Sequence, residues 1–372
     1  MKNRHCMLLG WGMLVSATVL GTAVVLVSSA LPAGEQPKFK AIWEPVNVKE
    51  DVELYSVHFV SAEEGWVAGG TSVLRGGVIY HTKDGGSTWE LQIGDPKSSD
   101  RAFSDLRFLD ATHGFAVQGS ASGDSKLYST SDGQTWVPVG HIETHRTDYR
   151  FTSMDTGFSL DRGGIQVTHD SGKHWQLAFP CQLKAEINGL TRNVNCSLER
   201  IFFPSPQVGY AVTQALPEHS GSALAKTEDG GMTWSIGVIL PGEDGDGGAL
   251  FFTDENTGYL RTRPANLFKT ADGGKTWTGM GGQAPEGSPD FDFAGADVGW
   301  MIAYHKMAYT TDAGKRWTSR EIGWPVSPTA FCLPTPQRGY VAGKHGMVYR
   351  YRIVPIDYTS KGMLAAPAMP PR

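Results

Sequence analysis

The stretch HTKDGGSTWELQI, residues 81–93, decides how the rest of the sequence is interpreted. It contains two short strand-like segments joined by a turn with Asp84 and Gly86, and Trp89 follows the turn. An aspartate at the start of a turn accepts hydrogen bonds from backbone N–H groups a few residues further on. Glycine supplies the positive φ that a hairpin turn requires, and tryptophan buries a large ring where the next strand begins. The stretch therefore predicts a β-hairpin held by its own turn residues.

The same turn motif occurs six times in the sequence. Five copies read Thr, any residue, Asp, any residue, Gly, two more residues and Trp. The copy with Asp132 and Trp136 is one residue shorter, so we expect a tighter turn or a displaced indole there. The aspartate and tryptophan pairs are Asp84 and Trp89, Asp132 and Trp136, Asp170 and Trp175, Asp229 and Trp234, Asp272 and Trp277, and Asp312 and Trp317. We expect these residues to be structural.

A second pattern precedes the turns and occurs seven times: apolar strand, polar turn, glycine, aromatic residue, apolar strand. Its glycines are residues 65, 114, 157, 209, 258, 299 and 339. A repeat of about 40–50 residues with four short strands is typical of a β-propeller blade. The last unit lacks a fourth strand, whereas the segment around Trp43 has a strand pattern and no partner. The sequence therefore predicts an all-β fold, a seven-bladed β-propeller over residues 39–355, closed by pairing its N- and C-terminal segments.

Two segments lie outside the predicted propeller. Residues 7–27 carry no charge, follow Lys2 and Arg4, and are long enough for one transmembrane helix. Residues 1–33 are expected to be an uncleaved signal anchor or a signal peptide cleaved after Ala30 or Ala33. Both alternatives export the propeller to the periplasm, the thylakoid lumen or the cell exterior. The tail, residues 356–372, is rich in proline and alanine and is expected to be disordered.

The cysteines fit an exported protein. Cys181 and Cys196 lie 15 positions apart in one long connection, and in an oxidising compartment we expect them to form a disulfide. Two free thiols are the alternative. Cys332 lies in the apolar segment TAFCLP and is expected to be a core thiol.

The six turns resemble the Asp-box, also called the bacterial neuraminidase repeat. Asp-boxes occur in sialidases, other glycoside hydrolases, sortilin-type receptors and the photosystem II stability and assembly factors. The seven glycine–aromatic units, the T-x-D-G-G-x-T-W turns and the exported layout resemble the assembly factors most closely. The resemblance implies a non-catalytic, membrane-tethered scaffold without a cofactor. It would bind and stabilise the photosystem II reaction centre, or a bacterial counterpart, during assembly.

The expected partner surface lies on one face of the ring. In a blade with strands a to d, the a–b and c–d turns share one face, and the longer b–c and d–a connections share the other. Loops on a rigid scaffold often carry binding residues, and the assembly-factor family has an arginine patch on one face. Four arginines are expected in b–c loops and suit recognition of carboxylates, namely Arg75, Arg162, Arg261 and Arg263. The alternative is that they are solvated loop charges.

The competing function is enzymatic. A sialidase needs three arginines around a carboxylate, a tyrosine–glutamate pair and an aspartate, and usually an Arg-Ile-Pro motif, which the sequence lacks. A xyloglucan-type hydrolase uses two carboxylates between tandem propellers, and this chain has room for one. The sequence also lacks zinc-ligand spacing and a calcium loop, and its net charge of −5 gives no support for nucleic-acid binding. We therefore expect no metal site and no enzyme activity, with a sialidase-like Asp-box hydrolase as the alternative.

Overall fold

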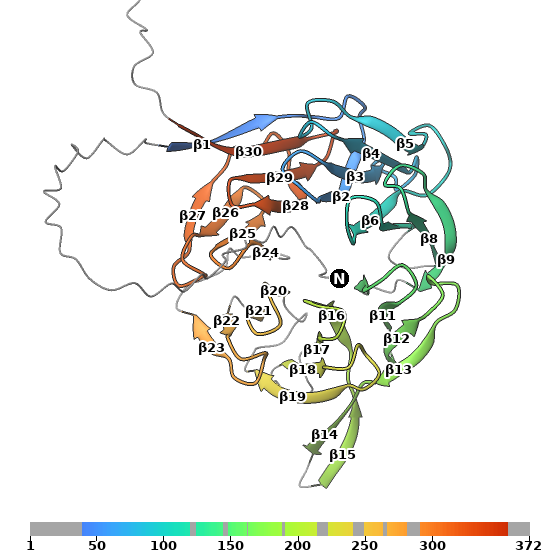
Figure 1. The fold of residues 1–372 in the computed structure, drawn as a ribbon, viewed down its shortest axis with the longest axis vertical. Helices are drawn as coiled ribbons and strands as arrows, with labels where there is room; N and C mark the ends of the chain where they lie inside the picture. The colour runs from blue at the N-terminus through green and yellow to red at the C-terminus, as the bar shows by residue number, and fades with distance from the viewer. Residues whose placement is uncertain are drawn as a thin grey trace, which may run out of the picture.

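The chain forms a ring of β-sheets, which we describe from a computed structural model (Figure 1). The structure describes residues 39–119, 124–143, 148–161, 163–187, 190–213, 222–240, 249–262, 266–280 and 291–355. These residues form seven four-stranded antiparallel sheets and one separate two-stranded ribbon. The predicted seven-bladed propeller is therefore confirmed. No helix in these ranges is long and apolar enough to cross a membrane. The segment 7–27 and the tail 356–372 lie outside the described residues.

The blades are numbered in ring order. Within each blade the strands are given in order from the innermost, beside the channel, to the outermost, at the rim. Blade 1 consists of β2 (Glu53–Phe59), β3 (Gly65–Gly70), β4 (Val78–Thr82) and β5 (Glu90–Gly94), and blade 2 of β6 (Phe103–Phe108), β7 (Gly114–Gln118), β8 (Asp124–Thr130) and β9 (Val137–Glu143). Blade 3 consists of β10 (Tyr149–Phe151), β11 (Gly157–Asp161), β12 (Gly164–Thr168) and β13 (Gln176–Pro180), and blade 4 of β16 (Leu198–Phe202), β17 (Gly209–Thr213), β18 (Ser222–Thr227) and β19 (Ser235–Leu240). Blade 5 consists of β20 (Leu250–Phe252), β21 (Gly258–Thr262), β22 (Asn266–Thr270) and β23 (Thr278–Met280), blade 6 of β24 (Phe291–Ala294), β25 (Val298–Ala303), β26 (Lys306–Thr310) and β27 (Thr318–Glu321), and blade 7 of β28 (Pro328–Thr335), β29 (Arg338–Gly343), β30 (Val348–Pro355) and β1 (Phe39–Pro45). The ribbon consists of β14 (Gln182–Ile187) and β15 (Leu190–Asn195).

Aromatic rings join neighbouring blades. Phe108, at the end of the inner strand of blade 2, stacks on Trp66 of blade 1 with centroids 3.7 Å apart. Its ring also meets Trp136, the tryptophan that follows the turn of its own blade, edge-on at 5.7 Å. The same arrangement occurs at six blade interfaces, in Tyr340, Phe59 and Trp89; Trp66, Phe108 and Trp136; Phe115, Phe151 and Trp175; Phe158, Phe203 and Trp234; Tyr210, Phe252 and Trp277; and Tyr259, Phe293 and Trp317. Both sequence repeats thus contribute to one interblade core.

The glycine of the second repeat is required by this packing. At Gly258 an added Cβ atom would overlap the ring of Phe252, which lies directly over the glycine backbone. The corresponding glycines of the first four blades are covered by a phenylalanine in the same way. The glycine therefore allows the phenylalanine to reach the preceding blade.

The six turns are held by their own side chains. In blade 5 the buried Thr270 hydroxyl accepts the N–H of Gly274 at 2.9 Å and donates to Asp272. Asp272 Oδ1 then accepts the N–H of Thr276 at 2.9 Å. The short turn differs, because Asp132 accepts the N–H groups of Gln134 and Thr135 instead. This is the tighter turn that the missing residue predicts.

The ring closes at blade 7, as the unmatched segment around Trp43 predicts. β1 pairs with β30 from Phe39↔Pro355 to Pro45↔Tyr349, so Trp43 lies on the outermost strand of that blade. The Trp43 ring lies 5.4 Å from Trp300 of blade 6. One strand from the N-terminal side thus completes a sheet that the C-terminal side begins.

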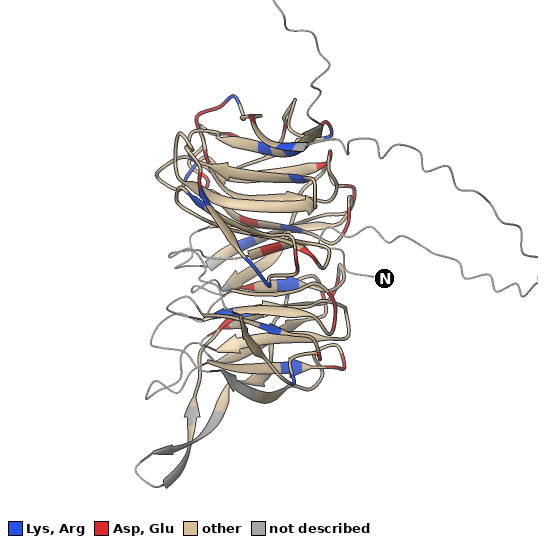
Figure 2. Cartoon of the chain, turned by 90° about the vertical axis from the view of Figure 1, so that its left-hand side faces the viewer, with Lys and Arg blue, Asp and Glu red and all other residues tan. Residues whose placement is uncertain are grey.

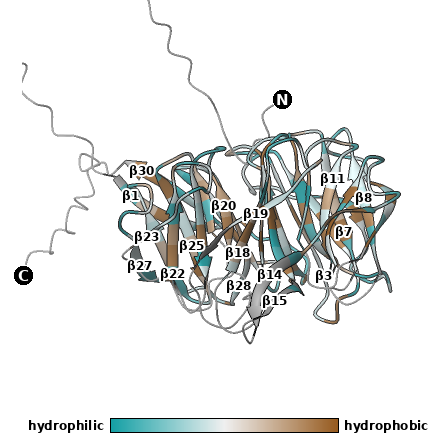
Figure 3. Cartoon of the chain, turned by 90° about the horizontal axis from the view of Figure 1, so that it is seen from below, coloured by the Kyte–Doolittle hydropathy of each residue, from teal (hydrophilic) through white to brown (hydrophobic). Residues whose placement is uncertain are grey.

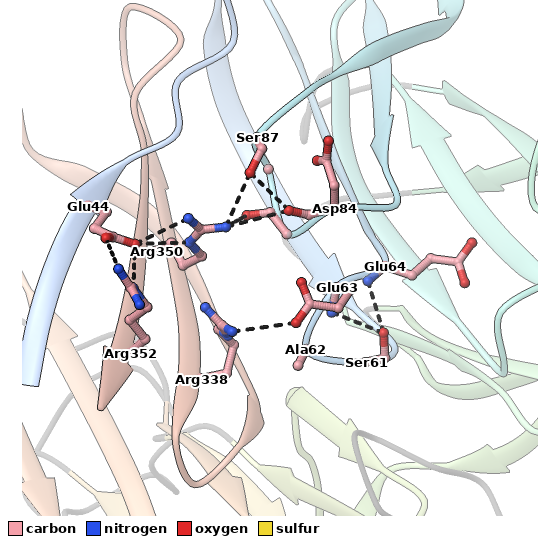
Figure 4. Close-up of polar contacts among 12 residues, drawn as sticks. Glu44, Ser61, Ala62, Glu63, Glu64, Asp84, Ser87, Arg338, Arg350 and Arg352 are labelled. Atoms are coloured by element: carbon pink, nitrogen blue, oxygen red, sulfur yellow. Dashed lines mark hydrogen bonds and ion pairs between the residues drawn. The ribbon is translucent and has the colours of Figure 1, made fainter. Parts of the chain in front are cut away.

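Ion pairs reinforce this closure (Figure 4). Glu44 on β1 accepts hydrogen bonds from Arg350 and Arg352 on β30. Arg350 Nη1 also donates to the carbonyl of Gly85 at 3.0 Å, in the turn of blade 1. Arg338 on β29 reaches Glu63 of blade 1 at 3.4 Å. Blade 7 is therefore fastened both to its own fourth strand and to its neighbour.

The two faces of the ring differ in charge. The a–b and c–d turns lie on one face, which we call the turn face, and the b–c and d–a connections lie on the other, the loop face. Figure 2 shows Asp and Glu concentrated along the turn face, and Figure 3 shows apolar residues concentrated in the strands between the faces. The six turn aspartates belong to the turn face. Among the described residues, the loop face is thus the less acidic surface.

Candidate partner-binding site

One position of the inner strand faces the channel in every blade. It precedes the last apolar residue of the segments VHF, LRF, YRF, IFF, LFF, FDF and FCL. We call these seven residues the channel ring: His58, Arg107, Arg150, Phe202, Phe251, Asp292 and Cys332. They line a central cavity of about 480 Å³, within the size range of ligand pockets. The cavity presents two arginines on the side of blades 2 and 3 and aromatic rings on the side of blades 4 and 5.

The cavity opens on the loop face. Its lining includes Tyr304, in the b–c turn of blade 6, and Ser327, just before β28. Both positions lie where strands meet the loop face. Tyr304 is 65% exposed and has a positive φ of 50°, which is uncommon for a tyrosine. An aromatic side chain is therefore held in the open at the mouth of the cavity.

Two arginines of the channel ring converge on one carboxylate. Arg107 Nη2 donates to Asp148 Oδ1 at 2.8 Å, and Arg150 Nη1 donates to the same oxygen at 2.7 Å. Arg107 Nε also donates to Asp105 at 2.8 Å. Each guanidinium lies near an aromatic ring: Arg107 is 5.2 Å from the centroid of Tyr149, and Arg150 is 5.7 Å from that of Phe202. Fixed partners on several sides hold both guanidinium groups in place.

Burial and neighbouring charge shape the protonation of this group. Burial raises the pKa of Asp148, although the positive charge of Arg107 opposes the shift. Burial alone would lower the pKa of Arg107, but the charges of Asp105 and Asp148 outweigh it and raise that pKa. Burial lowers the pKa of His58 to about 4, and Arg107 adds to this effect. At neutral pH His58 is therefore uncharged, and the positively charged groups on this side of the cavity are the two arginines.

The inner strands are bonded to one another around the channel. The N–H of Leu106 donates to the hydroxyl of Ser56 at 3.1 Å. In the same way the N–H of Ile201 donates to Asp148 at 3.2 Å, and that of Leu333 to Asp292 at 2.7 Å. A short polar side chain on one inner strand, or just before it, thus binds the backbone of the next inner strand. These bonds make the cavity wall a rigid frame.

The arrangement favours binding over acid–base chemistry. Asp105 and Asp148 are held by arginine, and the Cys332 sulfur accepts the N–H of Phe59 at 3.4 Å. Within the described ranges, no three His, Cys, Asp or Glu side chains are placed to hold a metal ion. A cavity with fixed guanidinium groups on one side and aromatic rings on the other suits an extended polypeptide with both apolar and acidic groups.

Of the four arginines predicted to bind a partner, the structure describes two, Arg75 and Arg261, and neither lies in the channel ring. Arg75 is exposed in a loop of blade 1, where Nη1 donates to the carbonyl of Ser99 at 2.7 Å. Arg261 is half-buried on β21 of blade 5, and its backbone N–H donates to Ala249. Arg162 and Arg263 lie outside the described residues. Blades 1 and 5 are not neighbours in the ring, so the joint role of these arginines stays a prediction.

The cysteines occupy the places that their sequence context indicates. Cys181 and Cys196 form a disulfide at the base of the two-stranded ribbon, and both are buried. Cys332 is a buried free thiol.

The residues of the channel ring are not among the site residues predicted from the sequence, although the sequence contains a pattern that indicates them. Residues on either side of the ring position are apolar in nearly every blade, whereas the ring position itself ranges from histidine through arginine to aspartate. When the seven inner strands are aligned on the glycine that follows each of them, the ring position is the one whose residue type varies from blade to blade. Asp148 has no such signal, because it precedes its strand and belongs to no repeat position.

Comparison with known proteins agrees with this architecture. A family model described as "Photosynthesis system II assembly factor YCF48" matches residues 36–197, which include blades 1 to 3. The photosystem II assembly protein Ycf48 of Thermosynechococcus vestitus is 23% identical over 345 residues, covering 90% of this chain and 91% of that protein.

Solved structures show the same fold. YCF48 from Cyanidioschyzon merolae superposes with a TM-score of 0.59 at 16% identity, covering 83% of this chain and 98% of that one. A structure described as YCF48 bound to D1 peptide gives a TM-score of 0.56 at 18% identity and covers 83% of this chain and 96% of that one.

A glycoside hydrolase of the GH74 type from Niastella koreensis also shares the fold, with a TM-score of 0.57 at 14% identity. The match covers 82% of this chain but only 53% of that enzyme, so the likeness ends at one propeller. The Ycf48 proteins, in contrast, are matched over nearly their whole length, by sequence as well as by fold. By sequence and by fold, this chain is thus similar to the photosystem II assembly factors of the BNR-repeat β-propeller type.

Proposed function

We propose that the protein is a non-catalytic, membrane-tethered scaffold that binds a photosystem II reaction-centre protein during assembly. The similarity to the Ycf48 proteins carries the proposal: one of them is matched over about nine tenths of both chains, and a structure of the same fold is described as bound to a D1 peptide. The partner is therefore inferred to be D1 or an equivalent reaction-centre polypeptide. The predicted anchor at residues 7–27 would tether the ring to the membrane that holds it.

The loop face is the proposed contact surface. The cavity opens there, and its mouth presents the exposed ring of Tyr304. Below the mouth, Arg107 and Arg150 offer fixed charge while Phe202 and Phe251 offer aromatic surface. Arg75, which lies in a loop on the same face, can add an ion pair at the edge. The turn aspartates and tryptophans are assigned a structural role, because their polar groups bind their own turn or the neighbouring blade.

Binding of a D1 peptide, measured by calorimetry, tests this proposal. Truncating an aromatic anchor in an interface costs more than about 1 kcal/mol in most hot spots. We therefore expect Tyr304→Ala to weaken peptide binding about 5- to 10-fold. Its side chain is exposed, so the fold should be unaffected.

Met232 is the matched control. Its side chain is 78% exposed in the turn of blade 4, on the opposite face. Met232→Ala should leave the affinity unchanged. An equal loss of peptide affinity in both variants would mean that the peptide does not bind at the mouth of the cavity on the loop face. Absence of any binding by the wild type, together with hydrolysis of a sialoside or a glucan, would favour the glycoside hydrolase alternative.

A further inference from the structure

A second cavity lies between blades 2 and 3, outside the channel. Its volume is about 360 Å³, within the size range of ligand pockets. One wall is the outer strand of blade 2, with His141 and Ile142, and the other is formed by β11 and β12 of blade 3 (Figure 1). Among the described residues, this cavity and the central one have no lining residue in common. The interblade cavity is therefore a separate site, which the proposed function does not use.

Blade 3 departs from the other blades at the position that lines this cavity. The residue after the repeat glycine faces the following blade, as Trp66 does, so the next residue and its partner on the third strand face the preceding blade. In six blades this pair is apolar or aromatic, namely Val67 and Tyr80, Ala116 and Tyr128, Ala211 and Ala225, Leu260 and Phe268, Met301 and Ala308, and Val341 and Tyr349. In blade 3 the pair is Ser159 and Gln166. Local departures of this kind from a fold's own pattern are expected at functional sites.

The two blades are held together beside the cavity. Trp175 Nε1 of blade 3 donates to the carbonyl of His141 in blade 2 at 2.9 Å. An added Cβ atom at Gly140 would overlap the carbonyl oxygen of Gly172, so the two backbones touch there. The cavity thus has fixed walls and does not result from a loose contact between blades.

The polar groups in the wall of blade 3 are held in place. Asp161 Oδ1 accepts the N–H groups of Gly163 and Gly164 at 2.7 and 2.8 Å. Asp161 Oδ2 accepts Gln166 Nε2 at 2.6 Å, and the glutamine amide has a second N–H and an acceptor oxygen besides this bond. The Ser159 hydroxyl, which is only 4% exposed, is both a donor and an acceptor. The wall thus presents neutral hydrogen-bonding groups of both kinds.

These groups indicate a neutral ligand with several hydroxyl groups. Asp161 brings one negative charge to the described lining and Lys173 one positive charge, so neither an anion nor a cation is favoured. An apolar ligand would leave Ser159 and Gln166 buried without partners. Hydroxyl groups both donate and accept, and the C–H face of a sugar ring packs on an indole such as that of Trp175, which lines the cavity.

We infer that the interblade cavity binds a neutral sugar ring, either as a free sugar or as the headgroup of a glycolipid. Ser159 and Gln166 would bond its hydroxyl groups, and Trp175 would pack against its ring. The site is a binding site, and the inference assigns it no reaction. It does not rest on the proposed partner, because the partner's cavity is lined by other residues.

Calorimetry on the full chain with the methyl glycosides of glucose, galactose and mannose tests the inference. We expect saturable one-to-one binding of at least one of them. Ser159→Ala with Gln166→Leu makes this pair apolar, as in the other blades, and Asp161 keeps its two glycine N–H donors. This double variant should bind the sugar at least 10-fold more weakly without a lower thermal midpoint. Gln207→Leu, at an exposed position in a turn of blade 4, is the control and should bind within 2-fold of the wild type.

Hydrogen exchange on the wild type locates the sugar without a variant. Amides of residues 137–142 and 164–168 should exchange at least 3-fold more slowly when the sugar is bound, whereas those of residues 298–310 in blade 6 should be unchanged. Absence of saturable binding by all three glycosides would overturn the inference. Equal binding by the double variant and the wild type, or tighter binding of acetate than of any glycoside at this site, would also overturn it.

Vesicles separate the two sources of the sugar. Wild-type binding to phosphatidylcholine vesicles that contain a diacylglycerol carrying the preferred sugar, lost in the double variant, would assign a glycolipid headgroup. Binding of the methyl glycoside without vesicle binding would assign a free sugar, and either result supports a neutral sugar site. If the wild type fails to bind a D1 peptide but binds the sugar, the proposed function alone is rejected.

Discussion

At the scale of single residues, we expect the buried turn threonine to contribute more to stability than its half-buried aspartate partner. Thr270 is almost fully buried, and its hydroxyl is the acceptor for the N–H of Gly274 inside the turn. Thr270→Val keeps the shape but removes this acceptor, which leaves a buried donor unpaired. We expect a loss of about 1–3 kcal/mol in the free energy of unfolding, measured by chemical denaturation.

The short turn of blade 2 supplies the control for this prediction. There Gln134 stands in the place of Gly274, and its N–H donates to Asp132 and not to the threonine hydroxyl. Thr130→Val therefore removes the bonds to Asp132 without orphaning that N–H. Its cost should be clearly smaller than that of Thr270→Val. Equal losses would mean that the threonine stabilises the turn through the aspartate alone.

The glycine before each aromatic residue gives a second prediction at this scale. A methyl group on Gly258 would overlap the Phe252 ring, which is itself stacked on Tyr210 of blade 4. Overpacking of this kind costs about 1–3 kcal/mol, so Gly258→Ala should lower the unfolding free energy by that amount. Gly279 is the control, because an added Cβ there would lie 3.9 Å from the ring of Phe268, and Gly279→Ala should be nearly neutral. A tolerated alanine at 258 would show that the ring can move aside.

At the scale of elements, Arg350 joins its own strand to two other segments, the closing strand and a turn of blade 1. Arg350 on β30 binds Glu44 on β1 and the carbonyl of Gly85 in blade 1 (Figure 4). Hydrogen bonds to charged groups contribute about 1.5–3 kcal/mol, so Arg350→Met should lower the unfolding free energy by that amount. Arg316, whose side chain is 88% exposed beside Asp312, is the matched control. Arg316→Met should cost less than about 0.5 kcal/mol. Equal effects would show that closure does not depend on this contact.

The turns also predict how stability depends on pH. Hydrogen bonds from Thr233 and Thr276 lower the pKa of Asp229 and of Asp272 to about 2. An aspartate with a lowered pKa stabilises the fold above its ordinary pKa near 4, and the contribution is lost as the pH falls through the folded value. Urea midpoints should therefore be steady above about pH 5 and should fall between about pH 4 and pH 2. Asp272→Asn cannot titrate and should reduce the slope; an unchanged slope would contradict this assignment.

At the scale of the whole molecule, repeated features were predictable from the sequence and unique ones were not. The glycine–aromatic repeat gives the blade count, and the unmatched strand around Trp43 gives the closure, because both follow from counting. The channel ring was missed because its residues differ from blade to blade, and repeat analysis favours positions that stay the same. Asp148 was missed because its role comes from Arg107 and Arg150, which lie on two different blades. Contacts between side chains of different blades cannot be predicted from the residue pattern that the blades share.

A second point at the scale of the whole molecule is the predicted membrane tether at its N-terminus. The propeller is closed by β1, which begins at Phe39, so residues 1–36 can be removed without opening the ring. If the segment 7–27 is an anchor, the truncated protein should leave the membrane fraction and stay folded. Its affinity for a D1 peptide in solution should stay within 2-fold of the full chain, because the loop-face cavity is intact. Tethering raises the effective concentration of a binding module near a membrane partner.

Truncation should therefore reduce the fraction of reaction-centre complex that carries the protein in membranes, while the peptide affinity is unchanged. Restoring the tether with an unrelated transmembrane helix should restore that fraction. The two readouts separate an anchor from a binding segment. If peptide affinity falls together with membrane occupancy, residues 1–36 take part in binding. If the truncated protein stays in the membrane fraction, it is held there by the propeller itself, and the tether has no role in finding the partner.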